Sequence, residues 1–163
     1  MYCGIDQSLT STGVWILDDE GNTKHHELIK TAKNKEDPSD LFNRIITITK
    51  RILSIVDEYN INNVCIEGLG FAANGDATRN LASLQGVIIC SLMDTCDVHI
   101  EIVAPTTLKK FASGKGNCDK NAMVDSLPDG ARVIVDEVPK SKGKYDLADA
   151  YFLSKYLLER DSK

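Results

Sequence analysis

The sequence lacks any apolar run near the ~18–20 residues that a helix needs to cross a membrane, so we expect no transmembrane segment. It also lacks a basic stretch followed by a cleavage site at its start, so we expect no secretory signal. Internal repeats, low-complexity tracts and long linkers are missing as well. A chain of 163 residues without such divisions is expected to form one compact domain over residues 1–163.

Cysteine and histidine are scarce and irregularly spaced. The five cysteines lack the CxxC spacing of a zinc site, and their odd number argues against a disulfide framework. The three histidines share no ligand spacing with them. Cys3 and Cys65 fall within apolar segments and are predicted to be small buried side chains. This usage favours a reducing, intracellular setting, and we expect a cytoplasmic protein.

An excess of positive charge is also missing, because 19 Lys and Arg residues face 24 Asp and Glu residues. A net charge of -5 argues against a wholly basic nucleic-acid-binding surface, since phosphate contacts favour Lys and Arg. Lysines do gather locally, with four in residues 106–121 and three in residues 139–144. Taken alone, such clusters are interpreted as solvated surface, although a local patch can bind DNA on an acidic protein.

Hydrophobic periodicity predicts the elements that are present. Alternation and short apolar runs predict strands over residues 2–6, 13–17, 24–30, 64–67 and 98–103. Helical spacing predicts helices over residues 39–59, 77–95, 105–112 and 146–159, and another beginning near residue 119. Residues 132–138 are ambiguous and are interpreted as a strand or a packed loop. The order predicts an α/β fold with a mixed five-stranded sheet flanked by helices.

Two acidic residues directly follow apolar strands. Asp6 ends the first predicted strand, and Glu67 ends the strand over residues 64–67. A carboxylate at the end of a buried strand is costly to desolvate, so it normally has a partner. Capping a helix and pairing with a lysine are structural alternatives to a functional role for each.

Two further acids begin the last predicted helix. Asp146 and Asp149 are three residues apart, so their side chains project from one helix face. Asp146 could be a helix N-cap. Asp149 is harder to explain, because like charges at this spacing repel by roughly a few tenths of a kcal/mol. Divalent cations neutralise such acids, and Mg²⁺ prefers oxygen ligands. Two ions about 3.5–4 Å apart suit phosphodiester hydrolysis.

These acids lie in segments that resemble a known family. Residues 4–13, 65–67 and 146–150 are similar, in order, to the three acidic motifs of RuvC-type Holliday junction resolvases, the crossover junction endodeoxyribonucleases. Gly86, in the middle of the second predicted helix, also fits the family pattern. A fourth block, residues 104–124, resembles the basic segment of the family, with Lys109, Gly114, Gly116 and Lys120 in register. The resemblance covers nearly the whole chain.

The resemblance implies a ribonuclease H-like fold and a homodimer that makes paired symmetric nicks in four-way (Holliday) DNA junctions. It implies two Mg²⁺ ions per active site, with Mn²⁺ as a substitute, in a two-metal mechanism. The implied metal ligands and catalytic acids are Asp6, Glu67, Asp146 and Asp149. Lys120 would help to stabilise charge on the scissile phosphate, and the implied DNA-binding residues are Lys109, Lys115, Lys120 and Phe71.

The chain departs from the cellular enzymes at several positions. Residues 7–9 are Gln-Ser-Leu where the family commonly has Pro-Gly-Ser, and Gly70 stands where an aromatic is typical. Phe71 follows, and it either stacks on a base or packs under its loop. Residues 129–144 are longer than the corresponding cellular segment. These departures resemble the phage-encoded branch of the family, which implies a virus-encoded protein acting in a host cell and leaves strict junction selectivity open.

Three alternatives accompany this interpretation. The first is a broader nuclease of the same fold that cuts flaps and other branched DNA. The second is a catalytically silent nucleic-acid-binding relative, against which the presence of all four acids argues. The third is a sugar kinase or actin-like ATPase, whose first strand also carries Gly-x-Asp. Such proteins need a second lobe, for which 163 residues leave no room.

Overall fold

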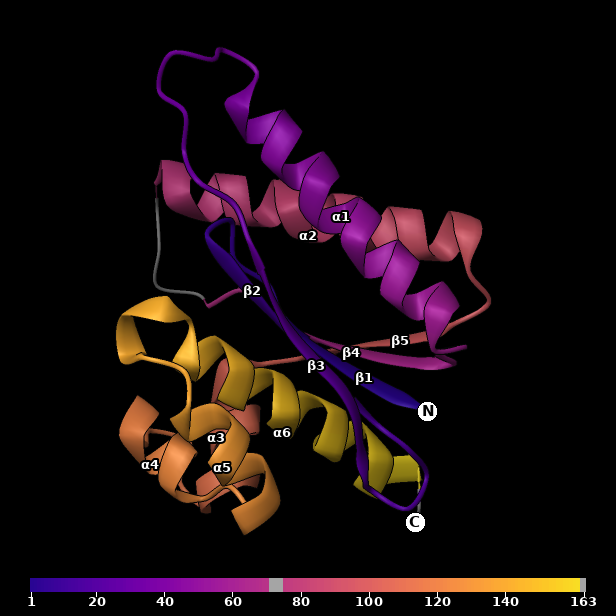
Figure 1. The fold of residues 1–163 in the computed structure, drawn as a ribbon, viewed down its shortest axis with the longest axis vertical. Helices are drawn as coiled ribbons and strands as arrows, with labels where there is room; N and C mark the ends of the chain where they lie inside the picture. The colour runs from indigo at the N-terminus through magenta and orange to yellow at the C-terminus, as the bar shows by residue number, and fades with distance from the viewer. Residues whose placement is uncertain (71–74, 162–163) are drawn as a thin grey trace.

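In the computed structural model, which describes residues 1–70 and 75–161, a sheet of five strands lies between two groups of helices (Figure 1). The strand order is β3-β2-β1-β4-β5, in which β1, β2 and β3 form an antiparallel meander and β1, β4 and β5 run parallel. The strands are β1 (Tyr2–Asp6), β2 (Ser11–Leu17), β3 (Thr23–Lys30), β4 (Asn63–Glu67) and β5 (His99–Val103). The predicted mixed five-stranded sheet is confirmed.

The helices cover both faces of this sheet. Helices α1 (Asp40–Glu58) and α2 (Asp76–Thr95) lie on one face (Figure 1). The other face carries α3 (Pro105–Ser113), α4 (Lys120–Asp125), α5 (Asp129–Asp136), the 3-10 turn η1 (Lys140–Lys142) and α6 (Lys144–Asp161). Within the described residues, no helix combines the length and the apolar character that crossing a membrane requires.

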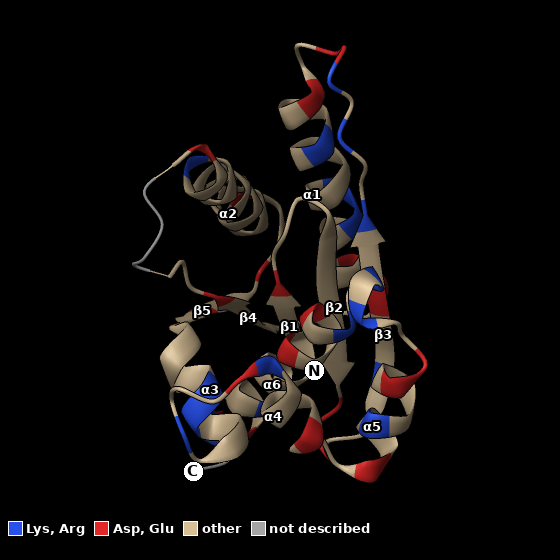
Figure 2. Ribbon diagram, turned by 90° about the vertical axis from the view of Figure 1, so that its left-hand side faces the viewer, with Lys and Arg blue, Asp and Glu red and all other residues tan. Residues whose placement is uncertain are grey.

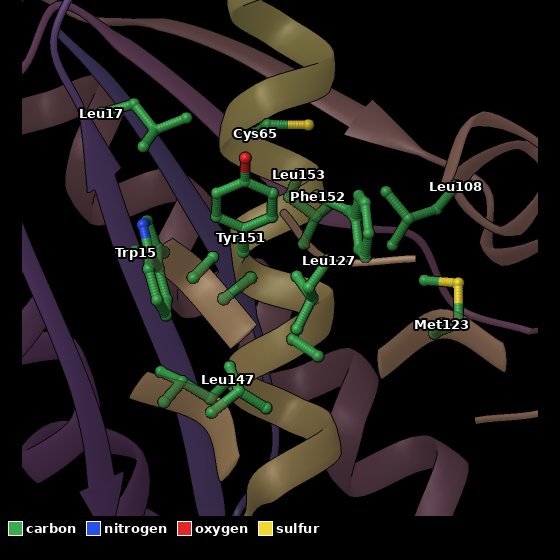
Figure 3. Packing of buried hydrophobic residues seen from close by; sticks show 14 of the residues in the cluster. Trp15, Leu17, Cys65, Leu108, Met123, Leu127, Leu147, Tyr151, Phe152 and Leu153 are labelled. Carbon is green, nitrogen blue, oxygen red and sulfur yellow. The ribbon is translucent and has the colours of Figure 1, made fainter. Parts of the chain in front are cut away.

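Strand alternation divides the buried side chains into two cores. Val14 and Ile16 of β2 pack with the helices α1 and α2, whereas Trp15 and Leu17 point to the opposite face and pack with α6. Figure 3 shows this second core, where the ring of Tyr151 lies between Trp15 and Phe152 and meets each of them edge-on. Because both faces are apolar, the central strands are buried on both sides, as the apolar runs predict. Cys65 is buried in this core, and the expected burial of both cysteines is confirmed.

Two glycines let α6 lie directly on the sheet. A Cβ atom on Gly4 would lie 2.0 Å from the carbonyl oxygen of Ala150, and one on Gly13 would lie 2.2 Å from that of Asp146. Any larger side chain would push the helix backbone away from β1 and β2. These two positions therefore fix the height of α6 above the strands.

The structure corrects one element and shifts several boundaries. Residues 132–138 are neither a strand nor a packed loop, because they belong largely to helix α5. Its buried residues Ala131 and Val135 are four apart, which is helical rather than strand spacing. The last helix begins at Lys144, two residues earlier than predicted, so Asp146 lies inside its first turn and is not its N-cap.

Candidate active site

The two strand-end acids lie side by side. Parallel strands β1 and β4 pair Ile5 with Ile66, so the next residues, Asp6 and Glu67, reach the same edge of the sheet. Ile5 and Ile66 point into the core under α1 and α2. Because side chains alternate along a strand, the two acids point toward the face that α6 covers.

Helix α6 brings the other two acids to this edge. Asp6 pairs across the β1–β2 ladder with Gly13, whose missing side chain leaves room for the backbone of Asp146. Asp149 follows almost one helical turn later and lies on the same face of α6. The close approach of helix and sheet therefore decides where both acids lie.

One cavity of about 360 Å³ joins the four acids. It lies where the carboxyl ends of β1 and β4 meet α3, α4 and the first turn of α6. Its lining residues are Asp6, Ser8, Glu67, Pro105, Lys109, Lys120, Met123, Asp146 and Asp149. Figure 2 shows red acidic segments at the strand ends beside the start of α6. Hereafter we call this space the carboxylate cavity.

Burial and mutual repulsion disfavour negative charge on the strand-end acids. Burial raises the pKa of Asp6 well above its usual range, and repulsion from the three neighbouring carboxylates raises it further. Burial also raises the pKa of Glu67. A hydrogen bond between these two acids raises the pKa of Asp6 and lowers that of Glu67. The positive charges of Lys120 and Lys109 also lower the pKa of Glu67. Asp6 is thus the acid that keeps its proton longer.

The helix acids are affected in the same direction. Burial, with repulsion from Glu67, raises the pKa of Asp149 to about 7, although Lys120 opposes the rise. Burial also raises the pKa of Asp146, against the opposing effects of the Ser11 hydroxyl and Lys120. The charged forms of all four acids are disfavoured in this cavity, and a bound cation would stabilise them.

The chemistry of these side chains fits a hard divalent cation, since carboxylate oxygens are the ligands that Mg²⁺ prefers. Among the described residues, no three His, Cys, Asp or Glu side chains are already close enough to ligate one ion. The acids that share the cavity would therefore have to rotate toward one another when they bind a cation. Asp6, Glu67, Asp146 and Asp149 are the residues that could do so.

Two predicted lysines reach the same cavity from the helices α3 and α4. Lys109 lies in α3, which Pro105 begins, and Lys120 is the first residue of α4. The Asp119 side chain accepts a hydrogen bond from the amide of Ala122 at 2.8 Å and caps α4, which fixes the direction in which Lys120 leaves the backbone. Both lysines can meet an anion at the edge of the carboxylate cavity.

The other two predicted DNA-binding residues are placed differently. Lys115 is exposed in the turn between α3 and α4 and does not line the carboxylate cavity. Phe71 lies outside the described residues, so its role stays a prediction. The structure therefore gathers the four acids with Lys109 and Lys120, and leaves Lys115 apart.

Three residues near the site escaped the sequence analysis. Gln7 and Gln85 each donate a hydrogen bond from the side-chain nitrogen to the backbone carbonyl oxygen of Glu67, at 3.0 and 2.9 Å. Ser8 lines the carboxylate cavity, and its carbonyl accepts a hydrogen bond from the Thr12 hydroxyl at 2.6 Å. The unusual Gln at position 7 was a signal, but its partner 60 residues away was not visible in the sequence.

An antiparallel meander extended by parallel strands, with acids at adjacent strand ends and on a covering helix, defines a ribonuclease H-like nuclease. The family described as "Crossover junction endodeoxyribonuclease RuvC" matches residues 2–150. The chain belongs to this RuvC family. The crossover junction endodeoxyribonucleases RuvC of Koribacter versatilis and Ehrlichia canis are 25% and 27% identical to it, each over 90% of this chain and over 85% and 88% of their own lengths.

Solved structures of Holliday junction resolvases are similar to this protein over nearly its whole length. Thermus thermophilus RuvC in complex with a Holliday junction substrate superposes with a TM-score of 0.73 and 19% identity, covering 98% of this chain and 94% of that one. The yeast mitochondrial Holliday junction resolvase Ydc2 has a TM-score of 0.67 and 14% identity, covering 98% and 78%. At these identities the likeness shows the fold, and the predicted ribonuclease H-like fold is confirmed.

Proposed function

We propose that this protein is a Mg²⁺-dependent endodeoxyribonuclease that resolves four-way DNA junctions by paired symmetric nicks inside the cell. The observation that carries the proposal is the carboxylate cavity, where acids from β1, β4 and α6 meet Lys109 and Lys120. Membership of the RuvC family supports DNA hydrolysis as the reaction. The similar structure that contains a Holliday junction supports the choice of substrate.

The four acids would hold two divalent ions, Mg²⁺ or in its place Mn²⁺. Such ions, when bound, activate the attacking water and stabilise the leaving 3′ oxygen. The protein contributes the position of the ligands, since Asp6 and Glu67 are fixed by the β1–β4 register and the helix acids by the contact of α6 with Gly13.

The two lysines of the cavity would handle the phosphate. Lys120 offsets negative charge at Glu67, Asp146 and Asp149, so its ammonium group acts on the space where a phosphate would enter. A cation fixed at that place stabilises charge that develops on phosphate oxygens. Lys109 would hold the DNA backbone beside it, and Lys115 would contact a phosphate farther along the strand.

We further propose that two copies act together. Paired nicks need two carboxylate cavities, and the described part of one chain supplies one. Helix α2 offers a face for a second copy, because the side chains on one side of it are small or apolar and exposed. These residues are Ala82, Ser83, Gly86, Val87, Cys90 and Met93. A Cβ atom on Gly86 would meet nothing within 4 Å, which leaves room for close helix packing.

The proposal is tested with purified protein, Mg²⁺ and a panel of four-way junction, flap, three-way branch and linear duplex DNA. We expect nicked duplexes from the four-way junction and loss of at least about 100-fold in rate for Asp6→Asn and Asp149→Asn. Asp129→Asn, which removes an exposed acid on α5, serves as the matched control and should keep full activity. Equal cutting of linear duplex would contradict the junction claim, and efficient cutting of flaps would favour the broader branched-DNA nuclease.

A further inference from the structure

A second cavity, of about 530 Å³, adjoins the carboxylate cavity and shares Lys120 and Asp146 with it. Its walls come from the end of β3, the turn η1 and the first turns of α4 and α6. Four lysines line it, and we call it the lysine groove: Lys30, Lys120, Lys140 and Lys142. Figure 2 shows the blue arrowhead end of β3, which carries the first of these lysines.

The positive charge of the lysine groove is largely uncompensated. Asp146 is the one carboxylate among its lining residues. Of the ion pairs that the described residues form, none involves Lys30, Lys140 or Lys142, and Lys140 donates a hydrogen bond only to the neutral side chain of Asn121, at 3.1 Å. Like charges gathered in one hollow repel one another, so the groove is electrostatically complementary to an anion.

The uncharged lining residues suit the same ligand. Hydroxyl groups from Thr10 and Ser141 lie among the lysines, and hydroxyls and ammonium groups are the side-chain donors that contact phosphates in protein–DNA complexes. The Thr31 hydroxyl also lines the groove but already donates its proton to the Leu9 carbonyl oxygen. The Tyr145 ring lies under Lys120, with 5.4 Å from the Nζ atom to the ring centroid. This cation–π contact holds Lys120 at the junction of the two cavities.

The wall formed by η1 is held firmly in place. Gly143 has a φ of +101°, and a Cβ atom there would lie 2.2 Å from the Ser11 hydroxyl and 3.0 Å from Leu28. The turn thus packs directly on β2 and β3, as only glycine permits in this conformation. The Lys142 amide donates a hydrogen bond to the Pro139 carbonyl oxygen at 2.8 Å and closes the turn itself. The Leu147 amide donates one to the Gly143 carbonyl oxygen at 3.0 Å and connects the turn to α6. The lysines of η1 therefore stand on a fixed support.

We propose that the lysine groove binds the phosphodiester backbone of the DNA strand next to the phosphate that enters the carboxylate cavity. The inference rests on the proposed function and names a binding site for that function's substrate. Because the two cavities share Lys120 and Asp146, one strand can pass from one into the other without leaving the protein surface. The supporting turn lies in residues 129–144, the segment that the resemblance predicts to be longer than in the cellular enzymes.

The test measures binding of a synthetic four-way junction by fluorescence anisotropy over a range of salt, with Asp149→Asn present in every variant to prevent cutting. Lys140→Gln combined with Lys142→Gln is compared with Lys24→Gln combined with Lys50→Gln, which removes the same charge from exposed lysines outside the groove. We expect roughly tenfold weaker binding for the groove variant, and a slope of log affinity against log salt that is smaller by about 1 to 2. The control should keep the slope.

Replacement of both groove lysines by arginine should restore the slope, because arginine keeps the charge. Equal slopes for the groove and control variants would overturn the inference, while cutting of junctions by the unaltered protein would leave the proposed function standing. Binding that depends on the groove, without cutting of any branched DNA, would support the groove and contradict the nuclease proposal. No binding of the junction by the unaltered protein would overturn both.

Discussion

The Asp149 carboxylate shares a buried cavity with three other acids. At pH 8 and without divalent cations, the nearby lysines only partly offset the repulsion between their negative charges. The pKa of Asp149 is raised to about 7 when folded, against an ordinary 3.8, so the folded state loses stability as the pH rises from about 4 to 7. Asp149→Asn should therefore raise the free energy of unfolding at pH 8 by about 1–2 kcal/mol and change it little below pH 4. Chemical denaturation at both pH values measures the difference.

Addition of Mg²⁺ should favour the stability of the unaltered protein over that of Asp149→Asn. A cation that binds only the folded state stabilises it, and the unaltered protein offers one more carboxylate than the variant. The unaltered protein should gain more stability from Mg²⁺ at pH 8 than Asp149→Asn does, in the same denaturation experiment. An equal gain for both proteins would exclude Asp149 as a metal ligand without any activity measurement.

The carbonyl oxygen of Glu67 has two side-chain donors, Gln7 and Gln85. Either replacement by alanine leaves one donor in place and should cost about 1 kcal/mol of stability. The double replacement leaves a partly buried acceptor unsatisfied, so it should cost about 1 kcal/mol more than the sum of the single changes. In contrast, Gln7→Ala with Asn43→Ala, which removes an exposed and separate hydrogen bond, should be additive. Additive costs for the glutamine pair would contradict a shared role.

At the scale of elements, the position of α6 depends on glycines beneath it. Gly4→Ala should lower the free energy of unfolding by about 1–3 kcal/mol, because the added Cβ would lie 2.5 Å from the Ser154 amide nitrogen as well as near the Ala150 carbonyl. Gly130→Ala on α5 is the control, since a Cβ there meets nothing within 4 Å and alanine favours the helix. Thermal unfolding of the two variants should therefore move in opposite directions.

The elements also show how far a sequence predicts a fold. Alternation placed β1, β2 and β3 to within two residues, because it depends only on neighbours along the chain. The strand-end positions of Asp6 and Glu67 are confirmed for the same reason. Helix α5 was missed because its amphipathic pattern spans only two turns and contains three β-branched residues, Val133, Ile134 and Val135. The contacts of Gln7 and Gln85 with Glu67 could not be predicted, since they join residues far apart in the chain.

At the scale of the whole molecule, the proposed dimer forms through the exposed face of α2. Val87 is 40% exposed on α2, and Val87→Lys should convert a dimer into a monomer, because an unpaired charge would be buried between the copies. Val133→Lys, at a site 64% exposed on α5, should leave the dimer intact. Sedimentation analysis of both variants measures this. A dimer that survives Val87→Lys would place the interface elsewhere, and a monomeric unaltered protein would contradict the assembly.

The sequence by itself determined where most strands and helices lie, that acids end two of the strands, and that Asp146 and Asp149 share a helix face. These features follow from side-chain periodicity over a few residues, which is local. Only the tertiary structure decided that β1 and β4 are parallel neighbours, that α6 approaches the sheet over Gly4 and Gly13, and that lysines from β3 and η1 meet beside the acids. Strand order and close packing depend on contacts between distant segments, and no local pattern in the chain encodes them.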